Sequence, residues 1–116
     1  MPSKPPMPSK QKPVVIDPER LRSAAGQAVI ALKVLAHEAR LLLLCQLSQG
    51  ERSVGELEEQ LGILQPTLSQ QLGVLRNEGV VTTRRQGKNI YYSVADPAVL
   101  EILGLLYRLY CPQGET

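Results

Sequence analysis

Apolar residues recur at spacings of four and three in the first part of the chain, which is the period of an amphipathic helix. Asp17 and Pro18 form an N-cap and first-turn pair that starts this pattern. The apolar positions that follow are Leu21, Ala25, Ala28, Leu32 and Leu35. The pattern predicts one long helix.

The same period predicts two shorter helices after it. The second helix covers about residues 37–48 through a leucine-rich stretch and ends before Gly50. The third starts at a capping box, in which the side chains of Ser53 and Glu56 satisfy free backbone N–H groups of the first turn, and it stops at Gly62.

A fourth helix opens at Gln65-Pro66 and ends at Gly79. Its predicted buried stripe consists of Leu68, Leu72 and Leu75. With the third helix and the short connection 62–64 it makes a helix-turn-helix, a motif that presents its second helix to the major groove of DNA. Polar side chains near the start of this helix can donate and accept hydrogen bonds at base edges. They are Gln65, Thr67, Ser69, Gln70 and Gln71.

After Gly79 the period becomes an alternating one. The alternating pattern predicts two strands, over Val80–Arg85 and Asn89–Val94. Gly87 supplies the turn of the hairpin between them. Such a hairpin acts as a wing whose tip reaches phosphate or the minor groove. The side chains expected to do so are Arg84, Arg85, Lys88 and Asn89. A basic tip considered alone is equally compatible with a solvated loop.

A last helix starts at Asp96-Pro97, runs to about Tyr110 and is ended by Pro112. Its apolar residues are Val99, Leu100, Ile102, Leu103, Leu105, Leu106, Tyr107, Leu109 and Tyr110. They cover most of the circumference, more than a surface helix of a small monomer needs, so we expect a homodimer to which the first helix also contributes. The alternative is a central core helix of a monomer. The predicted fold is mostly α with a small β-hairpin, a winged helix-turn-helix of order α-α-α-α-β-β-α.

Composition limits the size and the location of the protein. With 116 residues, 43% of them hydrophobic, the chain is expected to form one domain over residues 17–111. Residues 1–13 contain five of the nine prolines, three Lys and no acidic residue, and predict a disordered basic tail, either without a role or with an accessory contact to DNA. Because neither a secretory signal nor an apolar stretch of ~20 residues occurs, we expect a cytoplasmic protein with no membrane partner.

Charge is unevenly distributed, although the net charge is only +2. Residues 65–94 carry four basic side chains and one acidic one, net +3, whereas residues 51–61 carry one basic and four acidic ones, net −3. The positive charge therefore lies on the predicted recognition helix and wing, where it favours DNA, a polyanion.

Four segments carry a family resemblance: Leu32–Leu41 (LKVLAHEARL), Ser53–Leu57 (SVGEL), Gln65–Leu72 (QPTLSQQL) and Gly87–Tyr92 (GKNIYY). In this order, over roughly residues 20–111, they resemble the ArsR/SmtB family of bacterial repressors. The resemblance implies a winged helix homodimer that binds an inverted repeat in a promoter and leaves it when an inducer acts. It also implies the base-reading and wing residues named above.

Many members of that family sense metals, through Cys in the third helix or through Asp and His in the last helix. Here Ser53 and Gly55 stand at the third-helix positions, and the last helix contains Asp96 but no His. Metal sensing at those two sites is therefore not expected, and no cofactor is expected.

Two cysteines, Cys45 and Cys111, remain as candidate sensors. Considered alone, they are also compatible with two small buried hydrophobic residues. A subgroup of the family, the BigR-like and SqrR-like repressors, carries one Cys at each of these locations. Resemblance to it implies a dithiol switch that binds operator DNA when reduced and releases it after reaction with persulfide, other reactive sulfur species or oxidants. Cys111, near the chain end, is the candidate attacking thiol and Cys45 the resolving one.

Two other functions are compatible with parts of the sequence. A metal-responsive ArsR-type repressor would need a non-standard site that uses Cys45, Cys111 or His37. An interaction module without nucleic acid would use the apolar last helix. His37, at the start of the second helix, is expected to cap that helix or face solvent. An enzyme is not expected, because one His and no Ser-His-Asp, H-E-x-x-H or phosphate-binding Gly motif leave little for a catalytic site.

Overall fold

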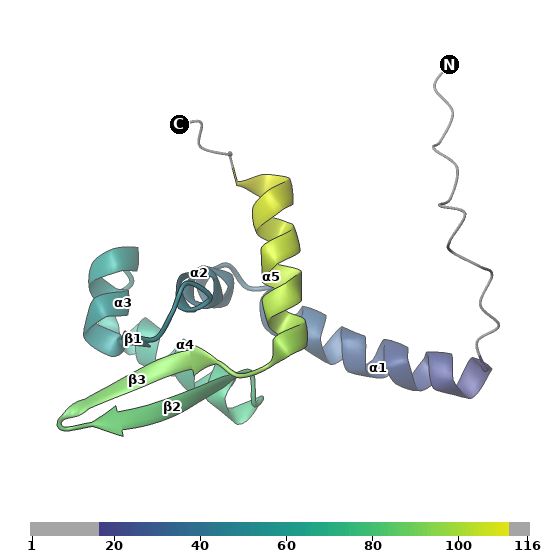
Figure 1. The fold of residues 1–116 in the computed structure, drawn as a ribbon, viewed down its shortest axis with the longest axis horizontal. Helices are drawn as coiled ribbons and strands as arrows, with labels where there is room; N and C mark the ends of the chain where they lie inside the picture. Colours follow the sequence, from purple (N-terminus) through teal and green to yellow (C-terminus); the bar gives the residue numbers. More distant parts are fainter. Residues whose placement is uncertain (1–16, 112–116) are drawn as a thin grey trace, which may run out of the picture.

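The computed structural model describes residues 17–111. Its elements are α1 (Pro18–Leu35), α2 (Glu38–Leu47), β1 (Arg52–Ser53), α3 (Val54–Leu61), α4 (Gln65–Asn77), β2 (Val81–Gln86), β3 (Asn89–Val94) and α5 (Pro97–Tyr110). The expected winged helix-turn-helix is confirmed, and every expected helix and strand is present (Figure 1). The expected tail at residues 1–13 and the helix-ending Pro112 lie outside the described residues.

Local capping explains why the helices begin where the sequence predicts. The His37 side chain accepts a hydrogen bond from the Arg40 N–H (3.4 Å), which confirms it as the cap of α2. Ser53 and Glu56 form both hydrogen bonds of the expected capping box at the start of α3. Gly62 ends α3 with a φ of 68°, a left-handed conformation that glycine adopts without strain.

The wing belongs to a three-stranded antiparallel sheet with the order β1-β3-β2. The hairpin pairs Arg84 with Tyr91, and β1 pairs Arg52 with Tyr92 on the other side of β3. The sequence pattern does not predict β1, because two residues are too short to show an alternating period. Only the packing of the segment before α3 against the wing reveals it.

The core lies between α2, α3, α4, the start of β2 and one face of α5 (Figure 1). Its most deeply buried side chains are Leu43, Leu44, Leu57, Leu68, Leu72, Leu75, Val99 and Leu103. The set includes the three leucines predicted to form the buried stripe of α4. This packing holds α4 and the wing in a defined orientation.

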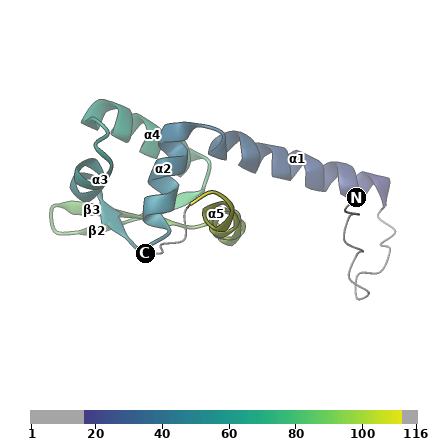
Figure 2. The same ribbon diagram turned by 90° about the horizontal axis from the view of Figure 1, so that it is seen from above.

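Helices α1 and α5 leave much apolar surface uncovered. α1 extends away from the other elements (Figures 1 and 2), and only Val34 and Leu35 at its end are buried. α5 buries Val99 and Leu103 alone, so it is not the central core helix considered as the alternative. The exposed apolar side chains on the two helices are Leu21, Val29, Ile30, Leu32, Leu100, Leu105, Tyr107, Leu109 and Tyr110.

Within residues 17–111, no helix combines the length and the hydropathy that a membrane span requires.

Candidate nucleic-acid interface and cysteine site

The first turns of α4 present a polar face to solvent. Gln65, Thr67, Ser69 and Gln70 are all exposed, and the Ser69 hydroxyl donates a hydrogen bond to Oε1 of Gln65 (3.0 Å). Leu68 lies on the opposite face and is fully buried. These four polar side chains are brought together where a helix-turn-helix offers groups to base edges.

Gln71 does not share this face, and in this respect the expectation from sequence is wrong. Its side chain is only 9% exposed, and its Oε1 accepts a hydrogen bond from Nη1 of Arg40 (3.0 Å). The reason is helical spacing: position 71 lies three residues after Leu68 and four before Leu75, on the buried stripe. Applied to Gln71, the same period would have revealed this from the sequence.

Arg40 has a structural role that no pattern in the sequence indicates. Its Nε and Nη2 donate to the backbone carbonyls of Val34 (2.7 Å) and Lys33 (3.2 Å) at the end of α1. Such terminal carbonyls lack partners within the helix, so the guanidinium satisfies them. With its bond to Gln71, Arg40 connects α1, α2 and α4.

The wing carries its cations in two different states. Arg85, Lys88 and Asn89 are exposed, and within residues 17–111 neither Arg85 nor Lys88 forms an ion pair. Arg84 is instead paired with Glu51, with 2.8 Å between Nη2 and Oε1. Hydrogen bonds from Arg84 lower the pKa of the Glu51 carboxyl below its ordinary value. Of the expected wing contacts, Arg84 is therefore the one whose charge is already matched inside the protein.

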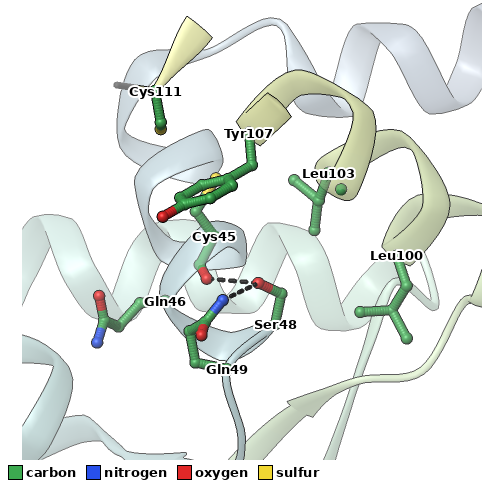
Figure 3. Close-up of a pocket in the computed structure, with 9 residues that line it drawn as sticks. Cys45, Gln46, Ser48, Gln49, Leu100, Leu103, Tyr107 and Cys111 are labelled. Carbon is green, nitrogen blue, oxygen red and sulfur yellow. Dashed lines mark hydrogen bonds between the residues drawn. The ribbon is translucent and has the colours of Figure 1, made fainter. Parts of the chain in front are cut away.

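The two cysteines come from α2 and from the residue after α5, and both line the same two cavities. One, of about 430 Å³, also has Ser48, Leu103 and Tyr107 in its wall (Figure 3). The other, of about 310 Å³, is lined mainly by leucine and tyrosine side chains. Both thiols are free, and no hydrogen bond joins them. The fold thus brings two residues far apart in sequence to one region without bonding them.

The two thiols differ in their surroundings. Cys111 is exposed, whereas Cys45 is only partly accessible. Burial raises the pKa of the Cys45 thiol above its ordinary value, and the nearby Cys111 contributes to the same rise by charge repulsion. At neutral pH, Cys45 therefore carries less of the nucleophilic thiolate than an ordinary exposed cysteine.

This difference predicts an order of alkylation. With iodoacetamide at neutral pH, Cys111 is expected to react severalfold faster than Cys45, because it is exposed and Cys45 is held protonated. Raising the pH should narrow the gap as Cys45 ionises. Peptide mass spectrometry over a time course measures both rates, and denatured protein, in which both sites are equally open, is the control. Faster labelling of Cys45 in the folded protein would contradict the assignment.

No cluster of three or more His, Cys, Asp or Glu side chains suited to a metal ion occurs between residues 17 and 111. His37 is occupied as the cap of α2.

Comparison with known proteins places the chain in a family. Residues 37–83 match the model of the bacterial regulatory protein, arsR family. The chain is 52% identical over 96 residues to a biofilm growth-associated repressor of Agrobacterium fabrum, covering 83% of this chain and 82% of that protein. Its fold is similar to the crystal structure of the transcriptional repressor BigR from Xylella fastidiosa, with a TM-score of 0.77 and 47% identity, covering 84% of this chain and all of that one.

Reduced HlyU from Vibrio cholerae is also similar, with a TM-score of 0.78 and 39% identity over 81% of this chain and 99% of that one. These relatives are transcriptional regulators and not enzymes, as the sequence predicts. The chain belongs to the arsR family of bacterial regulatory proteins and is similar within it to the BigR repressors.

Proposed function

We propose that this protein is a dithiol-switch transcriptional repressor. It binds operator DNA when Cys45 and Cys111 are reduced, and releases the DNA when these thiols react with persulfide, other reactive sulfur species or oxidants. The observation that carries the proposal is that the two thiols line common cavities between α2 and the end of α5. The relatives support the regulatory part, since two of them are described as repressors.

DNA is bound through the exposed start of α4 and through the wing. Gln65, Thr67, Ser69 and Gln70 face the base edges in the major groove, and all four are accessible. Arg85 and Lys88, with the Asn89 amide, reach the flanking phosphates or the minor groove. Gln71 supports this interface from within, because it holds α4 to Arg40.

The protein acts as a homodimer on an inverted repeat. The exposed apolar side chains of α1 and α5 supply the contact surface, since exposed apolar area of this extent is rarely left uncovered on small monomeric proteins. A two-fold dimer would place two copies of α4 on two half-sites, so the operator it binds is expected to be an inverted repeat.

The chemical step uses one thiol to attack and the other to resolve. The Cys111 thiolate attacks the terminal sulfur of a persulfide RSSH, forms Cys111-S-SH and expels RS⁻, which takes up the proton that Cys111 lost. The Cys45 thiol then attacks the Cys111 sulfur, releases hydrogen sulfide and leaves a Cys45–Cys111 disulfide. Where a second persulfide molecule first converts Cys45 to Cys45-S-SH, this group attacks the Cys111 sulfur of Cys111-S-SH, releases hydrogen sulfide and leaves a trisulfide bridge that retains one sulfur atom from the donor. A bridge holds the two Cα atoms roughly 6 Å apart. The proposed switch requires this constraint to shift the end of α5 against α2 and to carry the change towards α4.

The DNA-binding part is tested by the salt dependence of duplex binding. For reduced protein, the logarithm of the binding constant should fall steeply with the logarithm of salt concentration, because Arg85 and Lys88 displace counterions from phosphates. Arg85→Ala and Lys88→Ala should each make the slope about one unit shallower. Lys33→Ala, which removes an exposed cation at the end of α1, is the matched control and should leave the slope unchanged. If neither the variants nor the wild type binds the duplex, the result would favour the interaction module that does not bind nucleic acid.

A further inference from the structure

Arg84 is the most completely engaged cation of the wing. Its Nε donates to Oε2 of Glu51 (3.0 Å) and its Nη2 to Oε1 (2.8 Å), a two-pronged contact with one carboxylate. Its Nη1 donates to Oε1 of Gln86 (2.8 Å). The guanidinium also lies over the Tyr91 ring, 5.0 Å from its centre. All three guanidinium nitrogens therefore already have acceptors within the protein.

The sheet places these groups together. Arg84 on β2 pairs with Tyr91 on β3, and Arg52, the residue after Glu51, pairs with Tyr92 on the opposite side of β3. The ion pair therefore reaches across β3, from Arg84 on β2 to Glu51, the residue that precedes β1. Paired planar groups of this kind have a defined geometry, since a guanidinium and a carboxylate match in two parallel hydrogen bonds.

We propose that Glu51 is a positioning residue that keeps Arg84 from contacting DNA phosphates, so that the cations of the wing that bind DNA are Arg85 and Lys88. The proposal rests on the DNA-binding function proposed above and adds to it a residue that sets the strength of sequence-independent binding. Glu51 is the first residue of the acidic segment 51–61, directly before β1, and it is paired with the wing that carries the cations.

Charge accounting explains why Arg84 adds little to DNA binding. If the guanidinium turned from Glu51 to a phosphate, it would leave an unpaired carboxylate beside a polyanion. The pair has no net charge in either position, so it displaces about no counterion overall. Arg85 and Lys88 have no such partner and each contributes a full positive charge.

Pairing of Arg84 with Glu51 therefore lowers the affinity of the protein for DNA of any sequence. Phosphate contacts supply nearly all of non-specific binding, whereas base contacts on α4 supply the discrimination. Neutralising one wing cation within the protein weakens the phosphate contacts and leaves the base contacts of α4 unchanged. This raises the ratio of specific to non-specific affinity.

The test measures salt slopes on a duplex of mixed sequence with reduced wild type, Glu51→Gln, Arg84→Ala and the double variant. Glu51→Gln should bind roughly fivefold tighter at physiological salt and show a slope steeper by about one unit, because Arg84 becomes a free cation. Arg84→Ala leaves Glu51 as an unpaired carboxylate and should weaken binding, whereas the double variant removes both charges of a neutral pair and should keep the wild-type slope. Glu59→Gln removes an exposed carboxylate of α3 and controls for the general loss of negative charge.

The outcomes separate this inference from the function on which it rests. A slope for the double variant that is shallower than that of wild type, or an unchanged slope for Glu51→Gln, would overturn the role of Glu51 while wild type still binds DNA in a salt-dependent way. A gain for Glu59→Gln as large as that for Glu51→Gln would also overturn it. Absence of salt-dependent binding by wild type would instead refute the proposed function. Thermal melts confirm that each variant is folded, since Glu51 and Arg84 are both exposed.

Discussion

Treatment with a persulfide donor is expected to lower the affinity of the reduced protein for its operator by about 5- to 150-fold, the usual range of coupling between two sites in one protein. Bridging Cys45 to Cys111 pulls the end of α5 towards α2, and α2 packs on the α4 recognition helix. The operator is obtained by selection from a random duplex library with reduced protein, and affinity is read by mobility shift.

Three variants make this experiment specific. Cys111→Ser and Cys45→Ser should each stay bound to DNA after treatment, because neither can form the bridge. Ser48→Ala changes another residue of the same cavity but keeps both thiols, so it should respond as wild type does. Treated wild type that still binds with full affinity would refute the switch.

Mass spectrometry distinguishes the inducers in the same samples. A disulfide lowers the protein mass by two hydrogen atoms, whereas a polysulfide bridge adds whole sulfur atoms. A gain of sulfur with a glutathione persulfide donor but not with peroxide identifies a polysulfide bridge. If both reagents give the disulfide, release of hydrogen sulfide with the persulfide donor alone separates sulfur transfer from simple oxidation. Native spectra with Zn²⁺ or As(III) test the metal-responsive alternative, which predicts stoichiometric retention of the metal and release of DNA without a covalent change.

Leu105→Glu is expected to convert the dimer to a monomer and to weaken operator binding by at least about 100-fold. Leu105 is 45% exposed on α5 and lines neither cysteine cavity, so the monomer fold should tolerate the change. In the dimer, however, the new carboxylate would be buried without a partner, which is strongly unfavourable. The loss on DNA follows because a monomer engages one half-site and forfeits the gain from linked binding.

Analytical ultracentrifugation measures the oligomeric state directly. Gln60→Glu places the same charge on the exposed face of α3, away from α1 and α5, and should leave the state unchanged. A Leu105→Glu protein that remains dimeric would show that α5 does not form the interface. A monomeric wild type would refute the dimer itself.

The helices, the hairpin and the buried stripe of α4 follow from signals that act over a few residues. The capping box at Ser53, the cap at His37 and the end of the third helix at Gly62 are examples, and the structure confirms each of them. The family resemblance rests on the same local segments. Strand β1 is too short to carry such a signal and depends on pairing with β3.

The candidate site also has one part that the sequence predicts and one part that depends on tertiary structure. From the sequence alone, the polar start of α4 and the basic wing are identifiable, because residue type and helical period determine which side chains face outward. Tertiary structure decided which groups Gln71, Arg84 and the two cysteines lie against. The helical period by itself places Gln71 on the buried stripe of α4, but its partner Arg40 lies 31 positions away. Arg84 is held by Glu51, 33 positions away. Cys45 and Cys111 line common cavities only because α5 lies beside α2. Contacts across such separations arise from how whole elements pack, which no local pattern encodes.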